Sequence, residues 1–420
     1  MKVIISAYAC SPYKGSEPGV GWGFVKGLAP LHDLCVITEL SFKEDIDNYI
    51  NKYPELLKVR FEYVARARSR VAERIWPPAY YWTYRRWHQD AYRLAQQLHQ
   101  EMVFDVAHQL TMVGFREPGY LWKLGIPFVW GPVGGMGFFP WRFLPVVGGY
   151  GALYYLGYNF FNWWHMNFLA RPRQAANAAA SGAANGLITA TTENRAGAVK
   201  CWRCASSVLN EVGLPFEPFP NIHERAAEEP LRIFWSGLHI PRKALNLALQ
   251  ALSRLPADID WEITILGEGR KTNEWQLLAA ELGIGPRCHF LGWVPREQAL
   301  DVMARAHLVL ITSLRDLTST VTVEALALGL PIICLDHCGF ADVVNEQCGI
   351  KIFVTNPGEV VVEMTRVIER LARDESERQT LARGALQRAR DFSWKDKACV
   401  IDQIYRAKVA GTRIAVVGDL

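Results

Sequence analysis

Short apolar runs alternate with longer amphipathic stretches along the whole chain, and this alternation constrains the fold more than any other feature of the sequence. In the first half we expect strands at residues 2–8, 34–38, 59–64, 104–109, 127–131, 186–191 and 206–210. In the second half we expect them at 231–236, 261–266, 288–291, 307–312, 331–335 and 349–353. Strands separated by helical stretches such as 84–101 form parallel sheets with helices on both faces. The pattern therefore predicts an α/β protein with two Rossmann-like domains.

The boundary between the two domains is predicted at residues 213–230, which contain four prolines and show no apolar periodicity. A chain of 420 residues is also longer than one hydrophobic core usually supports. We expect an N-terminal domain over 1–220, a C-terminal domain over 221–394, and a last helix within 395–420 that packs back on the first domain. Ligands of open α/β sheets bind beyond the carboxyl ends of the strands. The expected site is therefore a cleft between two parallel sheets.

Composition and charge exclude several classes of protein. The net charge of +4 is too small to indicate a nucleic-acid partner, and no basic run is present. Nine cysteines, an odd number without a regular framework, fit reduced thiols in the cytoplasm. Cys201 and Cys204 form one C-x-x-C without the second pair that a structural zinc site needs, so no metal site is expected. The first residues are expected to form a strand rather than a signal peptide.

Residues 143–170 contain no Lys, Arg, Asp or Glu over a length that would suffice to span a bilayer. They also contain glycines, asparagines, a proline and many Tyr and Trp residues, and such aromatic residues favour the membrane interface over its hydrocarbon centre. Three interpretations stay open. The segment is a surface that faces a membrane, it is buried in protein or lines an acceptor groove, or it spans a membrane.

The segment FWSGLHIPRKALNLALQAL, residues 234–252, leads from a strand into a helix. Pro241 suits the start of that helix, because the first helical N–H groups have no partner within the helix. Lys243 then lies in the first turn, where the helix dipole disfavours a cation. A phosphate bound at this helix terminus would account for the lysine. The alternative is a solvated surface lysine.

Two further strand ends carry glycines. Gly267-Glu268-Gly269 follows one strand in a tight turn, and GWVP at 292–295 ends the next strand. Glycines at such turns let the backbone approach a flat ligand closely. The spacing differs from G-x-G-x-x-G, so a dinucleotide site is not supported.

Two carboxylates, Asp316 and Glu324, flank an uncharged run in SLRDLTSTVTVEALALGLPIICLD, residues 313–336. We expect a helix from about Thr320, preceded by hydroxyl residues that cap it and leave backbone N–H groups free to hold a diphosphate. Glu324, in the second turn, would then reach a sugar hydroxyl, as acidic residues do when they bind ribose. A helix cap with a nearby acid is the alternative, and it does not explain the uncharged run.

The first half offers weaker signals. The segment CSPYKGSEPGVGWGF, residues 10–24, follows the first strand, and its glycines either let a ligand approach the backbone or serve packing alone. His108 and the segment VWGPVGG, 129–135, also lie at strand ends. A single histidine is more often a satisfied core residue than a catalytic one, so both interpretations of His108 stay open.

Taken in order, these motifs resemble the GT-B glycosyltransferases of the large retaining family 4, also called group 1. The resemblance covers residues 230–395 and depends on the G-x-x-x-P-x-K segment around Lys243, the G-E-G turn, ELGIGPRCHFLGWVPREQ, the E-x7-E-like element that ends at Glu324, and EALALGLPIICLD. SPYKGSEPGVGW and WGPVGG resemble, more weakly, bacterial members that act in surface polysaccharide assembly.

The resemblance implies that the protein is a hexosyltransferase. It would move a sugar from a UDP- or GDP-sugar with retention of anomeric configuration, and without a bound metal or other cofactor. Its implied catalytic residues are Lys243, which would neutralise the donor diphosphate, His108, which would lie over the donor sugar, and Asp316. Glu324 would hold the ribose, and the backbone near Val294 the base. The implied donor-binding residues are Gly19, Gly21, Gly237, His239, Arg242, Gly267, Glu268, Val294, Ser319, Thr320, Val321 and Glu324.

Two positions depart from the family pattern. The first acidic residue of the family is usually Glu, and this chain has Asp316. Arg usually stands five positions before the motif lysine, where this chain has Leu238. A second phosphate-binding cation would then have to come from His239, Arg242 or Lys14. A non-catalytic or partner-dependent GT-B protein, and a nucleotide-sugar epimerase or hydrolase, are the alternatives.

The implied acceptor is a polysaccharide or a lipid-linked saccharide. The aromatic segments 74–89 and 138–170 are expected on the acceptor side, in contact with a membrane surface. We expect a cytoplasmic protein, or one that lies peripherally on the inner face of the cytoplasmic membrane.

Overall fold

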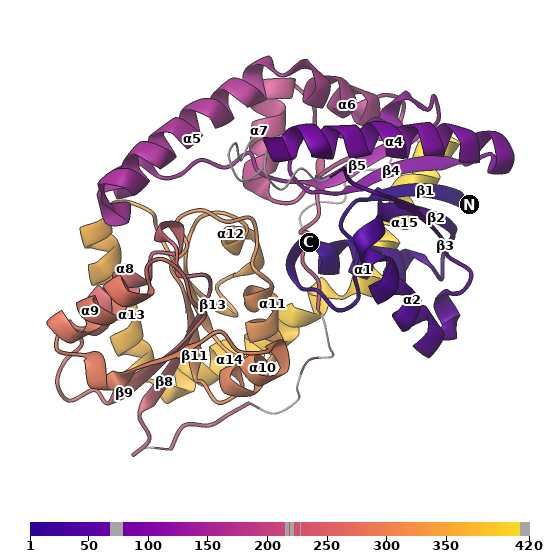
Figure 1. Cartoon of the computed structure of the whole chain (residues 1–420). Coiled ribbons are helices and arrows are strands. Elements are labelled where there is room, and N and C mark those ends of the chain that lie inside the picture. Colours follow the sequence, from indigo (N-terminus) through magenta and orange to yellow (C-terminus); the bar gives the residue numbers. More distant parts are fainter. Residues whose placement is uncertain (68–78, 215–217, 219–221, 227, 412–420) are drawn as a thin grey trace. The chain divides into compact units, whose positions relative to one another are not determined.

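The computed structural model describes residues 1–67, 79–214, 218, 222–226 and 228–411, so residues 74–78 of the first aromatic segment lie outside the description. The chain forms two compact units, each with its own parallel sheet (Figure 1). Unit 1 consists of Met1–Gly137, Trp163–Gly213 and the chain from Ser393 onward. Unit 2 consists of Phe138–Asn162 and Leu214–Phe392.

Unit 1 contains a seven-stranded parallel sheet in the order β3-β2-β1-β4-β5-β6-β7. Its strands are β1 (Lys2–Ala7), β2 (Asp33–Glu39), β3 (Arg60–Val64), β4 (Val106–Thr111), β5 (Phe128–Val133), β6 (Leu187–Thr189) and β7 (Ser207–Val208). Each strand expected in the first half of the chain is present. Strand order reverses between β1 and β4, where Val3 pairs with Leu34 on one side and with Val106 on the other.

Helices cover the sheet of unit 1. They are α1 (Ser16–Leu28), α2 (Lys43–Lys52), α4 (Ala79–Met102), α6 (Ala170–Ala180), α7 (Thr192–Trp202) and α15 (Trp394–Ala410). The last helix, α15, packs on α1. Gly23 permits this close packing, because a Cβ atom there would lie 2.2 Å from the ring of Trp394. The unit thus joins the two ends of the described chain.

Unit 2 contains a six-stranded parallel sheet in the order β10-β9-β8-β11-β12-β13. Its strands are β8 (Leu231–Ser236), β9 (Trp261–Leu266), β10 (Cys288–Gly292), β11 (Leu308–Ile311), β12 (Ile332–Leu335) and β13 (Gly349–Ile352). Its helices include α8 (Leu245–Leu252), α9 (Thr272–Glu281), α10 (Arg296–Met303), α11 (Thr320–Ala327), α12 (Phe340–Val343), α13 (Pro357–Arg373) and α14 (Glu375–Ala389). Strand order reverses between β8 and β11.

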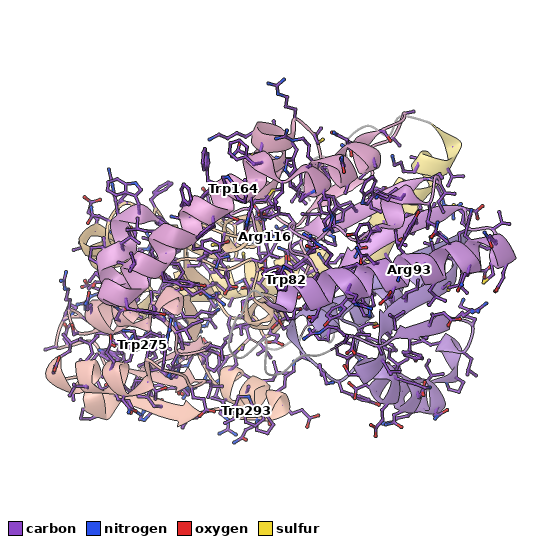
Figure 2. All side chains as sticks on the ribbon, turned by 45° about the horizontal axis from the view of Figure 1, so that its top comes forward. Trp82, Arg93, Arg116, Trp164, Trp275 and Trp293 are labelled. Carbon is purple, nitrogen blue, oxygen red and sulfur yellow. The ribbon has the colours of Figure 1, made fainter. Side chains whose placement is uncertain are left out.

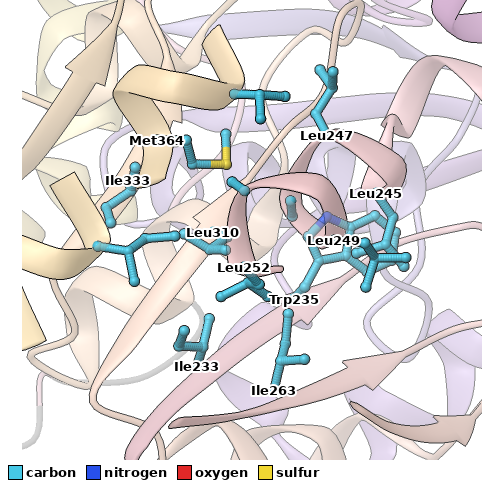
Figure 3. Packing of buried hydrophobic residues seen from close by; sticks show 14 of the residues in the cluster. Ile233, Trp235, Leu245, Leu247, Leu249, Leu252, Ile263, Leu310, Ile333 and Met364 are labelled. Carbon is cyan, nitrogen blue, oxygen red and sulfur yellow. The ribbon is translucent and has the colours of Figure 1, made fainter. Parts of the chain in front are cut away.

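The core of unit 2 lies between its sheet and the helices α8 and α13 (Figure 3). Ile233 and Trp235 of β8, Ile263 of β9 and Leu249 of α8 are fully or almost fully buried there. Apolar residues alternate along β8 and β9, and those that face α8 and α13 form this core. Strand β8 ends at the reversal point beside β11, and the core therefore positions the loops considered below.

The domain boundary expected at residue 220 is wrong for one segment. Residues 138–162 belong to unit 2, although the chain before and after them belongs to unit 1. Phe139, Phe143, Val147 and Tyr155 are buried in the same core as Trp235. The segment joins unit 2 because these side chains bury their apolar area against its sheet.

The segment 143–170 forms a short 3₁₀ stretch followed by the long helix α5 (Gly148–Phe168). Among the described residues no helix has the length and apolar character needed to cross a membrane. The membrane-span interpretation is therefore wrong. Tyr155 is buried in protein, as the second interpretation expects, whereas Tyr150 and Leu153 on the other side of α5 are exposed. That this exposed side faces a membrane stays a prediction.

Candidate functional site

The loops that follow β8 and β11 in unit 2 are held together by a chain of hydrogen bonds. The indole N–H of Trp235 donates to the hydroxyl of Thr312 (3.0 Å), and that hydroxyl donates to the carbonyl oxygen of Lys243 (2.7 Å). The N–H of Leu314 donates to the carbonyl oxygen of Arg242 (2.8 Å). Because Trp235 is buried in the core, this chain fixes the position of both loops.

Three charged side chains meet where these loops touch. Lys243 Nζ lies 2.6 Å from Asp316 Oδ2, and Arg242 Nη1 lies 3.2 Å from the same oxygen. Arg242 also donates to the carbonyl oxygen of Arg315 (2.6 Å). Lys243 is buried, so its charge is compensated mainly by Asp316. The solvated-lysine alternative is thereby wrong.

The ionised form of Asp316 is favoured by these neighbours. Burial raises the pKa of this carboxyl, but the charges of Lys243 and Arg242 and hydrogen bonds from Lys243 and the Leu317 N–H lower it more. The net pKa lies below its ordinary value. A second anion brought to Lys243 and Arg242 would share their charge with Asp316 and act against this shift.

The start of α8 differs from the expectation. Pro241–Lys243 form a single 3₁₀ turn, Ala244 adopts a left-handed conformation (φ 47°), and α8 begins only at Leu245. Lys243 therefore precedes the helix instead of lying in its first turn. The 3₁₀ turn directs Lys243 toward the loop after β11, where Asp316 lies.

Glycines allow the loops after β8, β9 and β10 to lie against one another. A Cβ atom on Gly267 (φ 104°) would lie 2.1 Å from the carbonyl oxygen of Gly237, and one on Gly269 would lie 2.6 Å from that of His239. Backbone hydrogen bonds then link the loops, from His239 N to Glu268 O and from Gly267 N to Gly292 O. The G-E-G turn is thus required by close backbone packing.

Of the side chains in this turn region, His239 is buried and Glu268 is exposed. The hydroxyl of Thr272 bonds to His239 Nδ1 (2.8 Å). Burial lowers the pKa of His239, so its ring is neutral near pH 7. Of the two candidates for a second cation in unit 2, Arg242 approaches Asp316, the partner of Lys243. The third candidate, Lys14 of unit 1, pairs with Asp45 (3.1 Å).

Glu324 lies in the second turn of α11, which begins at Thr320 as expected. Ser319 is the residue before the helix and makes no side-chain cap, and Thr320 and Val321 form its first turn. Glu324 is buried, and its Oε1 accepts hydrogen bonds from Arg296 Nη2 (2.6 Å) and Nε (3.1 Å). Glu324 therefore holds a cation at the edge of the same loops.

Arg296 was not identified from the sequence. It is the first residue of α10, two positions after Val294, which is half-buried in the loop after β10. The helix dipole disfavours a cation in the first turn of a helix. An arginine at the start of a helix is therefore the sequence signal that could have identified Arg296. The structure thus adds Arg296 to the residues around Glu324.

In unit 1, His108 differs from its expected role. Its side chain is completely buried in β4. Its Nε2–H donates to the carbonyl oxygen of Gly131 (2.8 Å), so its Nδ1 accepts from the hydroxyl of Tyr405 on α15 (2.6 Å). Burial lowers the pKa of His108 to about 4. Both ring nitrogens are engaged inside the core, so the structure does not offer His108 to a sugar and the core interpretation is correct.

Gly19 and Gly21 lie inside α1 rather than in an open loop. A Cβ atom on Gly21 would lie 2.1 Å from the carbonyl oxygen of Ala9, and one on Gly19 would lie 2.8 Å from that of Lys14. These two glycines therefore allow α1 to pack against the chain that leads into it. This packing accounts for them without a ligand.

Glu17, in the first turn of α1, is a titratable residue of unit 1 that was not identified from the sequence as a candidate functional residue. Its Oε1 accepts a hydrogen bond from the N–H of Val113, which follows β4 (2.5 Å). Burial raises the pKa of Glu17 to about 7, although this hydrogen bond lowers it. Glu17 thus links the carboxyl ends of β1 and β4 and changes its charge near neutral pH.

The raised pKa predicts how stability depends on pH. The folded state holds the Glu17 proton more tightly than the unfolded state does, so stability falls as pH rises from about 4.5 to about 7. We expect Glu17→Gln to raise the free energy of unfolding by about 1 to 3 kcal/mol at pH 8 and to change it little at pH 4.5. Urea denaturation at both pH values measures this difference.

Glu44→Gln, an exchange of an exposed acid on α2, is the matched control and should show no such pH dependence. Equal effects of the two variants at pH 8 would contradict the assignment of Glu17.

One cluster of potential metal ligands within unit 2 is unsuited to a cation. His223, Glu229 and His307 lie close together. The guanidinium of Arg232 bonds to both histidines and pairs with Glu229, so its positive charge already occupies the centre of the cluster. Cys201 and Cys204 of unit 1 are both free thiols.

Comparison with known proteins agrees with this arrangement. Residues 219–388 match the family model "Glycosyl transferases group 1". Over 172 residues the chain is 29% identical to the MMP alpha-(1->4)-mannosyltransferase of Mycolicibacterium hassiacum, which covers 41% of each chain. Over 146 residues it is 32% identical to the D-inositol 3-phosphate glycosyltransferase of a Nocardioides species, which covers 33% of this chain and 31% of the relative. The chain thus aligns with less than half the length of these relatives.

Solved structures resemble nearly the whole chain. The sucrose-phosphate synthase of Thermosynechococcus elongatus has a TM-score of 0.64 at 15% identity, and the likeness covers 98% of this chain and all of that one. HepE of Anabaena in complex with UDP has a TM-score of 0.61 at 15% identity and covers 97% of this chain and all of that one. The protein therefore has the GT-B fold, and its residues 219–388 match the glycosyl transferases group 1 family model.

Proposed function

We propose that the protein transfers a hexose from a nucleotide-diphosphate sugar to a polysaccharide or lipid-linked saccharide, with retention of anomeric configuration and without a bound metal. The observation that carries this proposal is the buried cluster of Lys243, Arg242 and Asp316 at the strand reversal of unit 2. Ligands of parallel sheets bind at such a point. The match to the group 1 family over the same unit supports it.

In the proposed reaction Lys243 and Arg242 stabilise the charge that develops on the departing diphosphate. Asp316 holds both cations in place before the donor binds, so little reorganisation is needed. In the same reaction, backbone N–H groups at Ser319, Thr320 and Val321, where α11 begins, would bind the same anion. The acceptor hydroxyl attacks from the face of the leaving group, and the departing phosphate takes its proton. Positioning and charge stabilisation then supply the rate enhancement.

Arg242 also bears on the non-catalytic alternative, which is motivated by Leu238. Leu238 is exposed and carries no charge. Arg242 lies beside Lys243 and supplies the second cation from a position four residues further along the chain. The cluster therefore retains two cations, which favours the catalytic proposal.

A donor screen tests the proposal. The purified chain is mixed with radiolabelled UDP- and GDP-sugars and a membrane extract, and label transferred to lipid or polysaccharide is counted. We expect transfer from one class of donor. Absence of transfer from any donor by a protein that binds UDP or GDP would sink the proposal, and release of free sugar or an epimer without acceptor would favour the epimerase or hydrolase alternative.

Glu324 gives a sharper prediction for donor binding. We expect Glu324→Ala to weaken the affinity for UDP or GDP about ten- to a hundredfold, because a hydrogen bond from a hydroxyl to a carboxylate contributes about 1.5 to 3 kcal/mol. Arg296 is half-exposed, so loss of its partner should leave the fold intact. Isothermal calorimetry with both nucleotides measures the change.

Glu297→Ala, an exchange of the exposed acid next to Arg296, is the control and should bind the nucleotide as the unmodified protein does. An unchanged affinity of Glu324→Ala would contradict the ribose assignment.

A further inference from the structure

One side of α5, the long helix labelled in Figure 1, carries a row of residues that are apolar and exposed. Between 43% and 77% of each of these side chains is exposed. Their spacing of three, four and seven residues places them on one face of a helix. The row consists of Tyr150, Leu153, Tyr154, Phe160, Phe161, Trp164 and Phe168, and Trp164 is labelled in Figure 2.

The opposite side of α5 is anchored in protein, which fixes the rotation of the helix. Tyr155 is buried and its ring stacks on that of Phe139 at 4.2 Å between centroids. The side chain of Asn159 accepts from the N–H of Phe139 (2.9 Å) and donates to its carbonyl oxygen (2.8 Å). Asn162 and Met166 are buried further along the same side. This anchoring determines which side of α5 is turned away from the core.

The charges around α5 indicate what the row meets. The helix carries no Asp, Glu, Lys or Arg. Arg142 precedes it in the sequence and Arg173 follows it, and both side chains are exposed. Arg142 donates to the carbonyl oxygen of Thr355 and also interacts electrostatically with the nearby carboxylate of Glu359. Arg173 donates to the carbonyl oxygen of Asn167. The positive charge of Arg173 is therefore available to an anionic partner, and that of Arg142 is shared with Glu359.

Aromatic residues with one polar end, such as Tyr and Trp, are enriched at the boundary between lipid headgroups and hydrocarbon. An apolar helical face that lies in this boundary binds more strongly when cations flank it and the lipids are anionic. Because one side of α5 is buried in protein, the helix would lie along the membrane plane, over a length of about 30 Å. Protein partners of such a face would instead need an apolar groove of similar length.

We propose that α5 is a membrane-docking helix, which inserts its exposed row of apolar residues at the surface of a bilayer that contains anionic lipid. The proposal extends the proposed function, because it names the surface by which the transferase reaches a lipid-linked acceptor. Docking itself requires neither a donor nor an acceptor. It is therefore tested without enzyme activity.

The test is flotation of the full chain with vesicles. Vesicles of phosphatidylcholine alone are compared with vesicles that also contain phosphatidylglycerol, at low salt. We expect the unmodified protein to float with the anionic vesicles. In the triple variant Leu153→Ser, Phe160→Ser, Trp164→Ser, the fraction of protein that floats with the anionic vesicles should be at least five times smaller. In the double variant Arg142→Gln, Arg173→Gln, this fraction should fall to the level found with vesicles of phosphatidylcholine alone.

A matched triple variant controls for the loss of exposed apolar residues in general. It is Leu277→Ser, Phe353→Ser, Val362→Ser, which changes three side chains of comparable exposure elsewhere in unit 2 and should float as the unmodified protein does. Failure of the unmodified protein to float, or equal flotation of the two triple variants, would overturn the proposal.

Two further measurements separate the outcomes. Light scattering shows whether the α5 row joins two copies of the chain. Membrane docking would also be overturned if the unmodified protein is a dimer that does not float, and if the α5 triple variant is a monomer. Calorimetry with UDP and GDP should give the same affinity for the α5 triple variant and the unmodified protein. Loss of docking with retained nucleotide binding then supports the docking role independently of sugar transfer.

Discussion

Replacing Lys243 with alanine should lower the rate constant of sugar transfer by about a hundred- to a thousandfold, the loss found when one preorganised group that stabilises developing charge is removed. Lys243 is buried, and its ammonium is held 2.6 Å from Asp316 by a loop that the core positions through Trp235 and Thr312. A cation fixed in this way stabilises a departing diphosphate without reorganisation. The donor identified in the screen is used, and kcat is measured at saturating donor.

In Lys243→Ala, Asp316 and Arg242 still form an ion pair, so a change in kcat can be assigned to the lost ammonium group rather than to unfolding. Their contact at 3.2 Å keeps Asp316 from becoming an unpaired buried charge, so the fold should persist. Lys351→Ala is the matched control, since Lys351 of the same unit also pairs with an acid, Asp336 at 3.5 Å. It should change kcat less than twofold. A similar kcat in Lys243→Ala and Lys351→Ala would remove Lys243 from the proposed mechanism.

Trp235→Ala should lower the free energy of unfolding by about 3 to 5 kcal/mol, as large-to-small exchanges of buried tryptophan do. Trp235 is almost fully buried in the core of unit 2 (Figure 3). Its ring contacts that of Trp275 edge-on, at 5.8 Å between centroids. Its loss also leaves the hydroxyl of Thr312 without its indole donor. Urea denaturation followed by circular dichroism measures the change.

Trp293→Ala is the control for this exchange. Trp293 is 71% exposed, so its removal should change the free energy of unfolding by less than about 0.5 kcal/mol. Trp235→Phe keeps most of the volume but not the N–H, and should cost about 1 kcal/mol for the lost hydrogen bond. Equal stability of Trp235→Ala and Trp293→Ala would show that the indole does not hold the core and the loops together.

Much of the fold could be predicted from the sequence because the signals are local. Val, Ile and Leu runs such as those of β8 and β9 end within one residue of the observed strands, since β-branched runs favour extended backbone wherever they are buried. The start of α11 at Thr320 was also predicted correctly, although Ser319 before it makes none of the side-chain cap bonds that the prediction assumed. The order of Lys243, the G-E-G turn, Asp316 and Glu324 likewise predicted one site, because each follows a strand of one parallel sheet, and the structure brings Lys243 and Asp316 of this set into contact.

The partners within that site could not be predicted in the same way. The pairing of Asp316 with Lys243 and Arg242, and of Glu324 with Arg296, joins residues about 30 to 70 positions apart in the chain. Their contacts depend on the 3₁₀ turn before α8 and on the register of β8 against β11. His108 shows the converse, since a strand-end histidine is indistinguishable in sequence from a catalytic one until its neighbours Tyr405 and Gly131 are known.

The sequence by itself determined the two parallel sheets, the strand ends that carry the site and the uncharged character of 143–170, because these properties reside in neighbouring residues. Only the tertiary structure decided that 138–162 belongs to unit 2 and that α5 buries Tyr155 while it exposes Leu153. The sequence of an apolar segment without charges is equally compatible with burial in a core, with the lining of a groove and with a membrane surface. Contacts with Trp235 and its neighbours, made across about 80 residues of chain, select one side of the helix for the core and leave the other side exposed.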